Sequence, residues 1–456
     1  MSKNNVQLYS RFECHKTSQE LIPLIRSASN LIKEKNGKLS ATPAYIFDDH
    51  LNLLYSHLFE KTDLEKRLKN LKASKLSIKI FDVLYHLQKE KDENLLNSML
   101  NSLSKELKNI KQKSPENYRI ICLTNIKKFS HTDFFEGRKK EFQIYKNILN
   151  IFDIKPIHPN DFKNNLENID KTNEKRIIAL LNYFNSASSE IIEINIKGRD
   201  LKYIYEKINQ KLDLLFGFLA FIKCSFWRFS SMGNEPIYNL DILSHFVLNA
   251  QDNLISPRNT FNVRHEINSN KPRWMLELKI SENYDKYQHY IKFIDENKDK
   301  KSLWKHLNNF LQLYQKACNE NSLDYSFLRF WMINESIIKK INGKTKDIEL
   351  KRTMIKILST FFEWPVEKFI EKRIDFLHDK RNLLVHEGNN QIINEEDRNL
   401  AKLIADTLLF FFIENYPKLN NLEEYKFYLQ NLNKNKDQIE SFKNILNVIS
   451  KDNELE

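Results

Sequence analysis

At roughly 100–200 residues per domain, the 456-residue chain has room for two to four domains with buried cores. Its 41% apolar and 29% charged residues exclude an intrinsically disordered protein, and its 7 glycines and 10 prolines are too few for turn-dense all-β folds or glycine-rich nucleotide loops. We therefore predict a mainly α fold. The net charge of +12 suits a polyanionic partner, but the abundance of Lys, Asn and Ile is also what A/T-rich codons produce.

The four cysteines do not form a site that the sequence can identify. They lie about a hundred residues apart, without the CxxC or Cys/His spacings of zinc sites and disulfide frameworks. The amino-terminal residues lack the apolar segment of a signal peptide, and Leu408–Ile413, one of the longest apolar runs, is far shorter than the roughly 20 residues that span a bilayer. We expect a cytoplasmic protein without a membrane span, a metal or another cofactor.

Residues 1–170 are predicted to form a mainly helical domain whose function the sequence does not indicate. Apolar residues recur there with helical spacing, for example at Leu54 and Leu58. The short segment Tyr118–Leu123 is rich in β-branched residues, which favours a strand. We place the end of this domain near residues 165–175.

Residues 171–295 are predicted to form a small mixed α/β middle domain. Apolar and polar residues alternate over Ile192–Ile196 and again over Leu276–Ile280, which is the pattern of half-buried strands. A long helix is expected from Asp200 to Phe229. The charged run Asp295–Ser302 is interpreted as a linker to the C-terminal third.

A short motif near residue 381 carries the strongest chemical signal. Arg381 and His386 are separated by four residues, and Asn382 directly follows the arginine. The same or a looser spacing occurs in two other pairs, Arg373 with His378 and Arg258 with His265. Spacing alone therefore does not identify a site, and the context must decide.

The context of the motif is a predicted helix between Pro365 and Gly388. At about 100° per residue, one face of this helix collects Ile370, Ile374, Leu377, Leu384 and Val385. Arg381 falls in the middle of that face, where an unpaired charge costs several kcal/mol, so it must be paired or functional. A structural interpretation is that Arg381 pairs with a carboxylate such as Glu335 and that His386 caps the end of the helix.

The surroundings of the motif extend the pattern. Asn394–Tyr416 is predicted to be a capped helix, and Leu323–Lys340 a long helix with an aromatic-rich face and the polar pair Asn334-Glu335. Together, the motif and these helices resemble the HEPN domain, most closely the ApeA-like branch of bacterial antiphage proteins. The resemblance covers roughly residues 300–417 and leaves the rest of the chain unexplained.

The resemblance implies an all-helical HEPN bundle over residues 300–417, followed by a helical or flexible charged tail over 418–456. It implies a metal-independent endoribonuclease that acts as a homodimer through this bundle. The site residues that it implies are catalytic Arg381, Asn382 and His386, with Glu335 and Asn334 supporting them. The substrate would be RNA, with tRNA as a candidate. The protein would be a toxic effector of antiphage abortive infection, controlled by a phage-derived trigger or a regulator from a neighbouring gene.

These residue types agree with the implied chemistry. In metal-independent cleavage the 2′-hydroxyl of RNA attacks the adjacent phosphate; histidine can move the protons, and arginine can stabilise the charge that develops on phosphorus. Asn382 would orient the histidine or bind phosphate, and Glu335 would fix Arg381. Two alternatives stay open: a HEPN domain without cleavage activity that serves as a dimerisation and RNA- or protein-binding module, and a metal-dependent nuclease.

Overall fold

The structure is a computed structural model. It describes residues 14–35, 38–41, 44–127, 136–157, 189–225, 240, 242–251, 254–258, 278, 284–297, 301–343, 346–361, 367–386, 393–416, 418–431, 438 and 440. Fourteen α-helices lie in these residues, which confirms the mainly α class. Among the same residues, none of the helices combines the length and apolar character that a bilayer span needs.

The chain divides into two compact units that interleave along the sequence. Unit 1 contains Met1–Ile120, Ile194–Asn209 and Phe246–Pro257, and unit 2 contains Ile121–Glu193, Gln210–His245 and Arg258–Glu456. This division does not follow the ranges 1–170, 171–295 and 300–417 that the sequence suggested. The boundary expected near residues 165–175 lies outside the described residues, so it stays a prediction.

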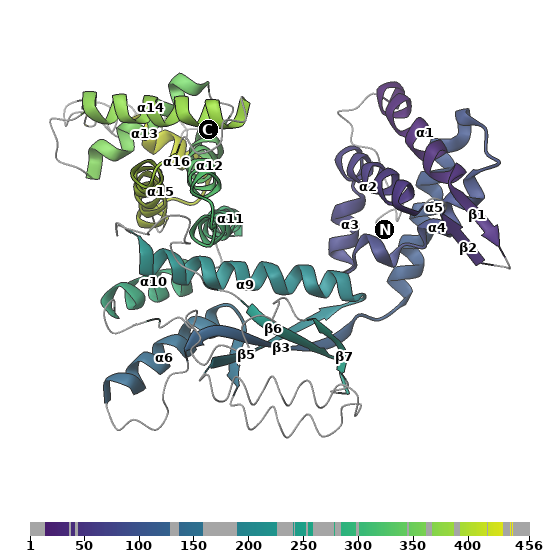
Figure 1. Ribbon diagram of the computed structural model, residues 1–456, viewed down its shortest axis with the longest axis horizontal. Coiled ribbons are helices and arrows are strands. Elements are labelled where there is room, and N and C mark those ends of the chain that lie inside the picture. Colours follow the sequence, from purple (N-terminus) through teal and green to yellow (C-terminus); the bar gives the residue numbers. More distant parts are fainter. Residues whose placement is uncertain are drawn as a thin grey trace, which may run out of the picture. The chain divides into compact units, whose positions relative to one another are not determined.

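Unit 1 contains a cluster of helices, as the helical spacing predicts (Figure 1). They are α1 (Cys14–Asn30), α2 (Ala44–Lys61), α3 (Leu64–Asn70), α4 (Ile80–Leu87) and α5 (Asp92–Gln112), with a short 3₁₀ turn at Lys75–Ser77. Leu54 and Leu58 are fully buried in their shared core. An antiparallel hairpin, β1 (Ile32–Lys35) and β2 (Lys38–Ala41), joins them. The sequence pattern does not predict it, because strands of four residues carry too few apolar positions to show an alternation.

The larger sheet has five strands in the order β4-β5-β3-β6-β7. Their bounds are β3 (Glu116–Lys127), β4 (Ile154–Ile157), β5 (Ser189–Gly198), β6 (Ile242–Leu248) and β7 (Leu254–Arg258). Strands β3 and β5 confirm the predictions over Tyr118–Leu123 and Ile192–Ile196. The predicted strand over Leu276–Ile280 lies outside the described residues except for Leu278, which is buried.

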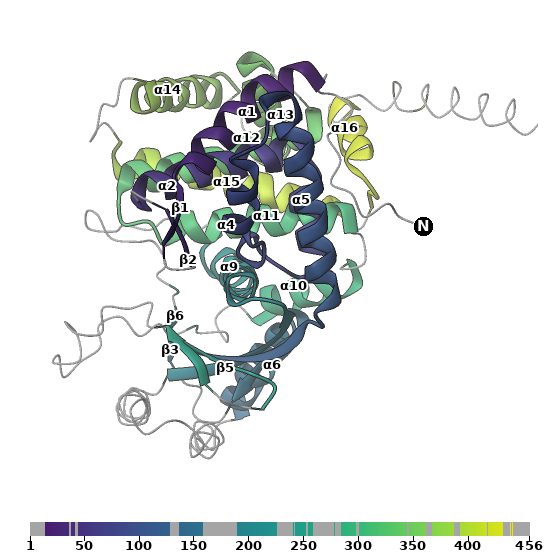
Figure 2. The same cartoon turned by 90° about the vertical axis from the view of Figure 1, so that its right-hand side faces the viewer.

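The predicted long helix after Asp200 is α9 (Leu201–Cys224), which runs along the sheet in Figure 1 and is seen nearly end-on in Figure 2. Residues 226–229, the predicted end, lie outside the described residues. Within unit 2, Gly217 of α9 lies against Leu311, where an added Cβ would overlap the Leu311 carbonyl. Glycine at this position therefore lets two helix backbones approach each other closely.

The linker predicted over Asp295–Ser302 is wrong at both ends. Residues 295–297 belong to α10 (Tyr284–Asn297), and Lys301 begins α11 (Lys301–Cys318). Helix α10 buries Tyr287 and Tyr290, and the buried Asn297 side chain donates a 2.9 Å hydrogen bond to the Phe293 carbonyl. Packing of the apolar face of α10 extends this helix into a stretch of charged and polar residues.

The C-terminal part of unit 2 is a bundle of helices (Figure 1). Besides α11 it contains α12 (Leu323–Asn342), α13 (Asp347–Phe361), α14 (Glu367–His386), α15 (Glu395–Asn415) and α16 (Leu422–Asn431). Helix α12 packs against α11, α13, α15 and α16. The helices predicted over Leu323–Lys340 and Asn394–Tyr416 are confirmed, and the start of the predicted tail forms α16.

Asn394 begins α15 with a reciprocal capping box. Its side chain accepts a hydrogen bond from the Asp397 amide, and the Asp397 carboxylate accepts one from the Asn394 amide. Both contacts satisfy backbone donors that the first turn of a helix leaves free. This is the local reason why the chain turns into α15 at the expected residue.

Candidate active site

Helix α14 presents the Arg381 motif. Ile374, Leu377 and Leu384 are buried on it, which confirms most of the predicted apolar face, whereas Val385 is 48% exposed and does not belong to it. The side chain of Ile370 lies outside the described residues. Arg381 lies next to the buried face with 26% of its side chain exposed. It is therefore neither fully solvated nor sealed in the core.

Arg381 pairs with Glu335 of the neighbouring helix α12. Their Nε and Oε1 atoms lie 3.7 Å apart, and the carboxylate side chain is 16% exposed. The pairing suggested by the position of Arg381 on its apolar face is therefore present. A partly buried ion pair of this kind is less screened by salt than a surface pair.

Two further donors from α12 hold the Glu335 carboxylate. The indole Nε1 of Trp331 donates a 2.8 Å hydrogen bond to Oε1, and the ammonium of Lys339 lies 2.7 Å from Oε2. Both donors stand one helical turn from Glu335, so α12 itself sets the orientation of the carboxylate. Arg381 thus faces a carboxylate that cannot rotate freely.

Asn382 connects Arg381 to His378, the histidine of the Arg373–His378 pair. Its Oδ1 accepts a 3.0 Å hydrogen bond from Arg381 Nη1, and its Nδ2 lies 3.3 Å from Nδ1 of His378. The His378 side chain is only 12% exposed, and its Nε2 lies 3.5 Å from Asp347. His378 and Asn382 are four residues apart on α14, a spacing that could have identified the contact.

The side chains around Arg381 form a closed ring of contacts. Starting at Trp331, contacts run through Glu335, Arg381, Asn382 and His378, and the His378 imidazole returns to the Trp331 indole with ring centroids 6.0 Å apart. We call these five residues the Arg381 network. Each member is held by two others, which fixes the guanidinium in one geometry without burying it completely.

The two remaining predicted site residues lie differently. His386 is the last residue of α14, and its side chain lies outside the described residues, so its distance to Arg381 is open. Asn334 is fully buried, and its Nδ2 donates a 3.2 Å hydrogen bond to the Ala401 carbonyl. The contact that the structure gives Asn334 joins α12 to α15, which differs from the supporting role expected beside Arg381.

Two lysine–carboxylate contacts fix α14 on its neighbours. Lys380 forms an ion pair with Asp397, the buried residue of the α15 capping box, and Lys351 of α13 pairs with Asp375. Helix α14 is thereby anchored to α13 and α15 as well as to α12. Rigid anchoring of this kind keeps a site residue within a narrow range of positions.

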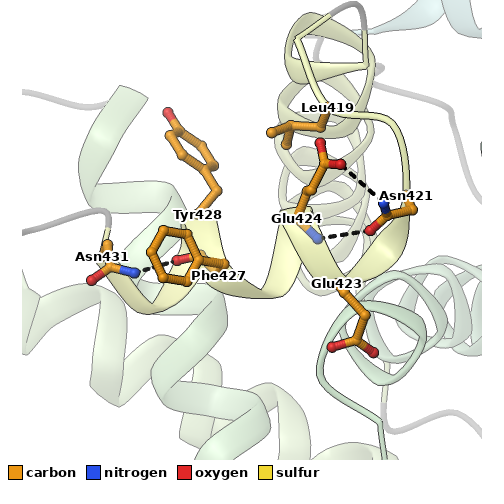
Figure 3. Close-up of a pocket in the computed structure, with 7 residues that line it drawn as sticks. All are labelled: Leu419, Asn421, Glu423, Glu424, Phe427, Tyr428 and Asn431. Carbon is orange, nitrogen blue, oxygen red and sulfur yellow. Dashed lines mark hydrogen bonds between the residues drawn. The ribbon is translucent and has the colours of Figure 1, made fainter. Parts of the chain in front are cut away.

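The described residues hold no group of three or more His, Cys, Asp and Glu side chains that could bind a metal ion. They do contain a groove of about 510 Å³ around α16 (Figure 3). Two of its polar side chains are paired at the start of α16, where Asn421 exchanges hydrogen bonds with Glu424. With Glu423 and Glu424 in its lining, this groove does not suit a phosphate.

No protein-family model, curated protein or solved structure that was compared with the chain matches it.

Proposed function

We propose that this protein is a metal-independent endoribonuclease. The observation that carries the proposal is the Arg381 network. In it, Glu335 and Asn382 hold the permanently charged guanidinium of Arg381, whose side chain is about one-quarter exposed. A cation that is fixed before the reaction and still reachable from solvent suits the stabilisation of negative charge on a phosphate. The resemblance of the motif to HEPN domains supports the same reaction.

In the proposed reaction, the 2′-hydroxyl of one nucleotide attacks the adjacent phosphate. The bond from phosphorus to the 5′-oxygen of the next nucleotide breaks, which leaves a 2′,3′-cyclic phosphate and a 5′-hydroxyl. Arg381 stabilises the phosphate oxygens, and His386 accepts or returns the proton. Asn382 binds phosphate or orients a histidine, and Glu335 positions Arg381.

We propose that two copies of the chain act together through the C-terminal bundle. Phe376 and Leu383, which are seven residues apart on α14, are 46% and 38% exposed, and Val385 is 48% exposed. Three exposed apolar side chains on the helix that carries the motif favour contact with a second copy. In the cell, the proposed role is that of a toxic effector of antiphage defence. Its proposed target is RNA, with tRNA as a candidate.

The deciding experiment incubates the purified full-length protein with total RNA in EDTA. We expect cleavage with 2′,3′-cyclic phosphate or derived 3′-phosphate ends, identified by mass spectrometry. Arg381→Ala and His386→Ala should each abolish cleavage, while Arg373→Ala on the same helix should retain it. Products with 3′-hydroxyl ends formed only with Mg²⁺ would indicate a metal nuclease. Absence of cleavage with retained RNA binding would favour the non-catalytic module.

A further inference from the structure

Unit 1 brings together two lysine-rich segments that are distant in sequence. Asp200, at the start of α9, accepts hydrogen bonds of 2.7 Å from both the amide and the hydroxyl of Ser74 and of 2.6 Å from the hydroxyl of Ser77. Arg199 donates to the Leu71 carbonyl from the same side. The segment after α3 is therefore fixed against the first turn of α9 (Figure 1).

Five lysines lie on the two segments that this junction joins, and we call them the basic surface: Lys69, Lys72, Lys75, Lys202 and Lys207. Lys69 and Lys72 are exposed, and the other three are partly exposed. Burial and then the charge of Lys202 lower the pKa of Lys75, and burial and then the charge of Lys69 lower the pKa of Lys207. Lys75 thus senses the charge of Lys202, and Lys207 that of Lys69, while Glu206 offsets part of the repulsion at both and Glu65 forms an exposed 2.8 Å ion pair with Lys69.

The charge of the chain is concentrated in the unit that carries this surface. Unit 1 has 25 Lys and Arg residues against 17 Asp and Glu, an excess of eight positive charges, whereas unit 2 has 47 against 43. A composition bias from codon usage would act on both units alike. The uneven distribution therefore indicates that unit 1 is basic for a reason of its own.

Lys72 adds an independent observation. Its φ of 53° places it in the left-handed region, where a non-glycine residue is strained. It follows α3 in a Schellman motif, since the Ala73 amide donates to the Leu68 carbonyl and the Lys72 amide to the Lys69 carbonyl. Glycine is the usual residue at this position, so the chain places an exposed ammonium group where backbone geometry favours glycine.

We propose that the basic surface of unit 1 binds the phosphate backbone of the RNA on which the protein acts. The inference rests on the proposed ribonuclease function for the identity of the polyanion. Several ammonium groups on one rigid junction attract phosphates without reading bases. The surface accordingly contributes affinity that is independent of RNA sequence and sensitive to salt, and it leaves the chemistry to Arg381 and His386.

The test measures binding of a fluorescent single-stranded RNA by anisotropy over a series of salt concentrations. The protein is the full chain carrying Arg381→Ala, so that the RNA stays intact. Lys69→Gln, Lys72→Gln and Lys202→Gln are added together, and the matched control carries Lys105→Gln, Lys108→Gln and Lys111→Gln on the exposed side of α5. Both triple variants lose the same charge within unit 1.

We expect the basic-surface variant to bind RNA about tenfold more weakly, with the slope of log affinity against log salt reduced by about two, because each lost phosphate contact on a single strand removes roughly 0.7. The α5 control should match the parent protein. Equal effects of the two triple variants would show that only total charge matters and would overturn the proposal. Stronger binding of wild-type protein to phosphatidylserine vesicles than to RNA, lost in the basic-surface variant, would also overturn it.

Lys72→Gly separates binding from folding. This variant should melt at a higher temperature, since glycine relieves the left-handed strain, and yet bind RNA more weakly. The binding proposal and the proposed function can fail separately. If wild-type protein cleaves RNA, and the three Lys→Gln substitutions weaken neither binding in the Arg381→Ala protein nor cleavage when Arg381 is present, the surface is wrong and the ribonuclease stands. If RNA binding is lost in the variant but wild-type protein never cleaves, the surface stands and the ribonuclease assignment fails.

Discussion

The indole of Trp331 and the imidazole of His378 lie with their ring centroids 6.0 Å apart, and this contact closes the ring of side-chain contacts around Arg381. Trp331 is 1% exposed and also donates to Glu335. One buried residue of α12 therefore contacts both neighbours of the Arg381–Asn382 pair. The arrangement makes the geometry of Arg381 depend in part on a side chain that is itself buried.

Glu335→Gln should lower RNA cleavage by about 10- to 100-fold while Arg381 remains present, because the amide keeps the shape of the carboxylate but loses its charge. A positioning role predicts that kcat falls with little change in KM. The matched control is Glu320→Gln, whose carboxylate pairs with Arg329 at 2.9 Å in the same bundle and is 19% exposed. Equal losses of activity in both variants would indicate a general effect on the bundle rather than on Arg381.

His378 and His386 can be distinguished by substitution. His378→Gln should reduce cleavage by about tenfold, since it perturbs Asn382 through the 3.3 Å contact, whereas His386→Ala should abolish it. The pH profile of the residual activity provides the second readout. If His378→Gln abolished cleavage and His386→Ala retained it, proton transfer would belong to His378.

The sequence predicted what local rules determine. Caps and helical spacing identified α12, α14 and α15, and the position of Arg381 on an apolar face suggested its pairing with Glu335. It failed where tertiary packing decides. Val385 has the spacing of a core residue and is nevertheless exposed. The spacing between Arg373 and His378 does not by itself identify a site, and His378 nevertheless contacts Asn382. Neither outcome can be derived without the position of α14 relative to its neighbours.

Lys402 and Asp406 of α15 form a buried ion pair that should be important for folding. Each side chain is 1% exposed, their charged atoms lie 2.7 Å apart, and Asp406 also accepts a 2.6 Å hydrogen bond from Tyr314. Lys402→Met should lower the free energy of unfolding by about 3–5 kcal/mol, because it leaves a buried carboxylate without its cation. Adding Asp406→Leu should recover part of this loss.

Urea denaturation provides the measurement for this pair. The control is Lys292→Met, which removes an exposed i,i+4 pair with Glu296 whose side chains are 77% and 60% exposed. That change should cost no more than about 0.5 kcal/mol. A loss below about 1 kcal/mol in Lys402→Met would contradict the assignment of a desolvated pair.

Lys286 of α10 should make stability depend on pH in the alkaline range. Burial lowers the pKa of its ammonium group from 10.5 to about 8, with Asp406, Lys402 and Cys224 as its charged and titratable neighbours. Its Nζ lies 2.5 Å from the hydroxyl of the buried Ser225 at the end of α9. Between these two pH values the unfolded chain holds a proton that the folded chain has lost, so the contribution of this group to stability rises with pH and is smallest below pH 8.

The prediction is tested as a difference between two proteins, which cancels the titration of all other groups. The free energy of unfolding is measured for wild type and for Lys286→Met from about pH 7 to about pH 10. The advantage of the methionine variant should be largest at the acid end and shrink as pH rises, because wild-type Lys286 becomes neutral there. Lys292→Met on the same helix should give a curve parallel to that of wild type, since its side chain is 77% exposed. An advantage of Lys286→Met that grew with pH would reverse the assigned sign and show that the folded state prefers the charged ammonium.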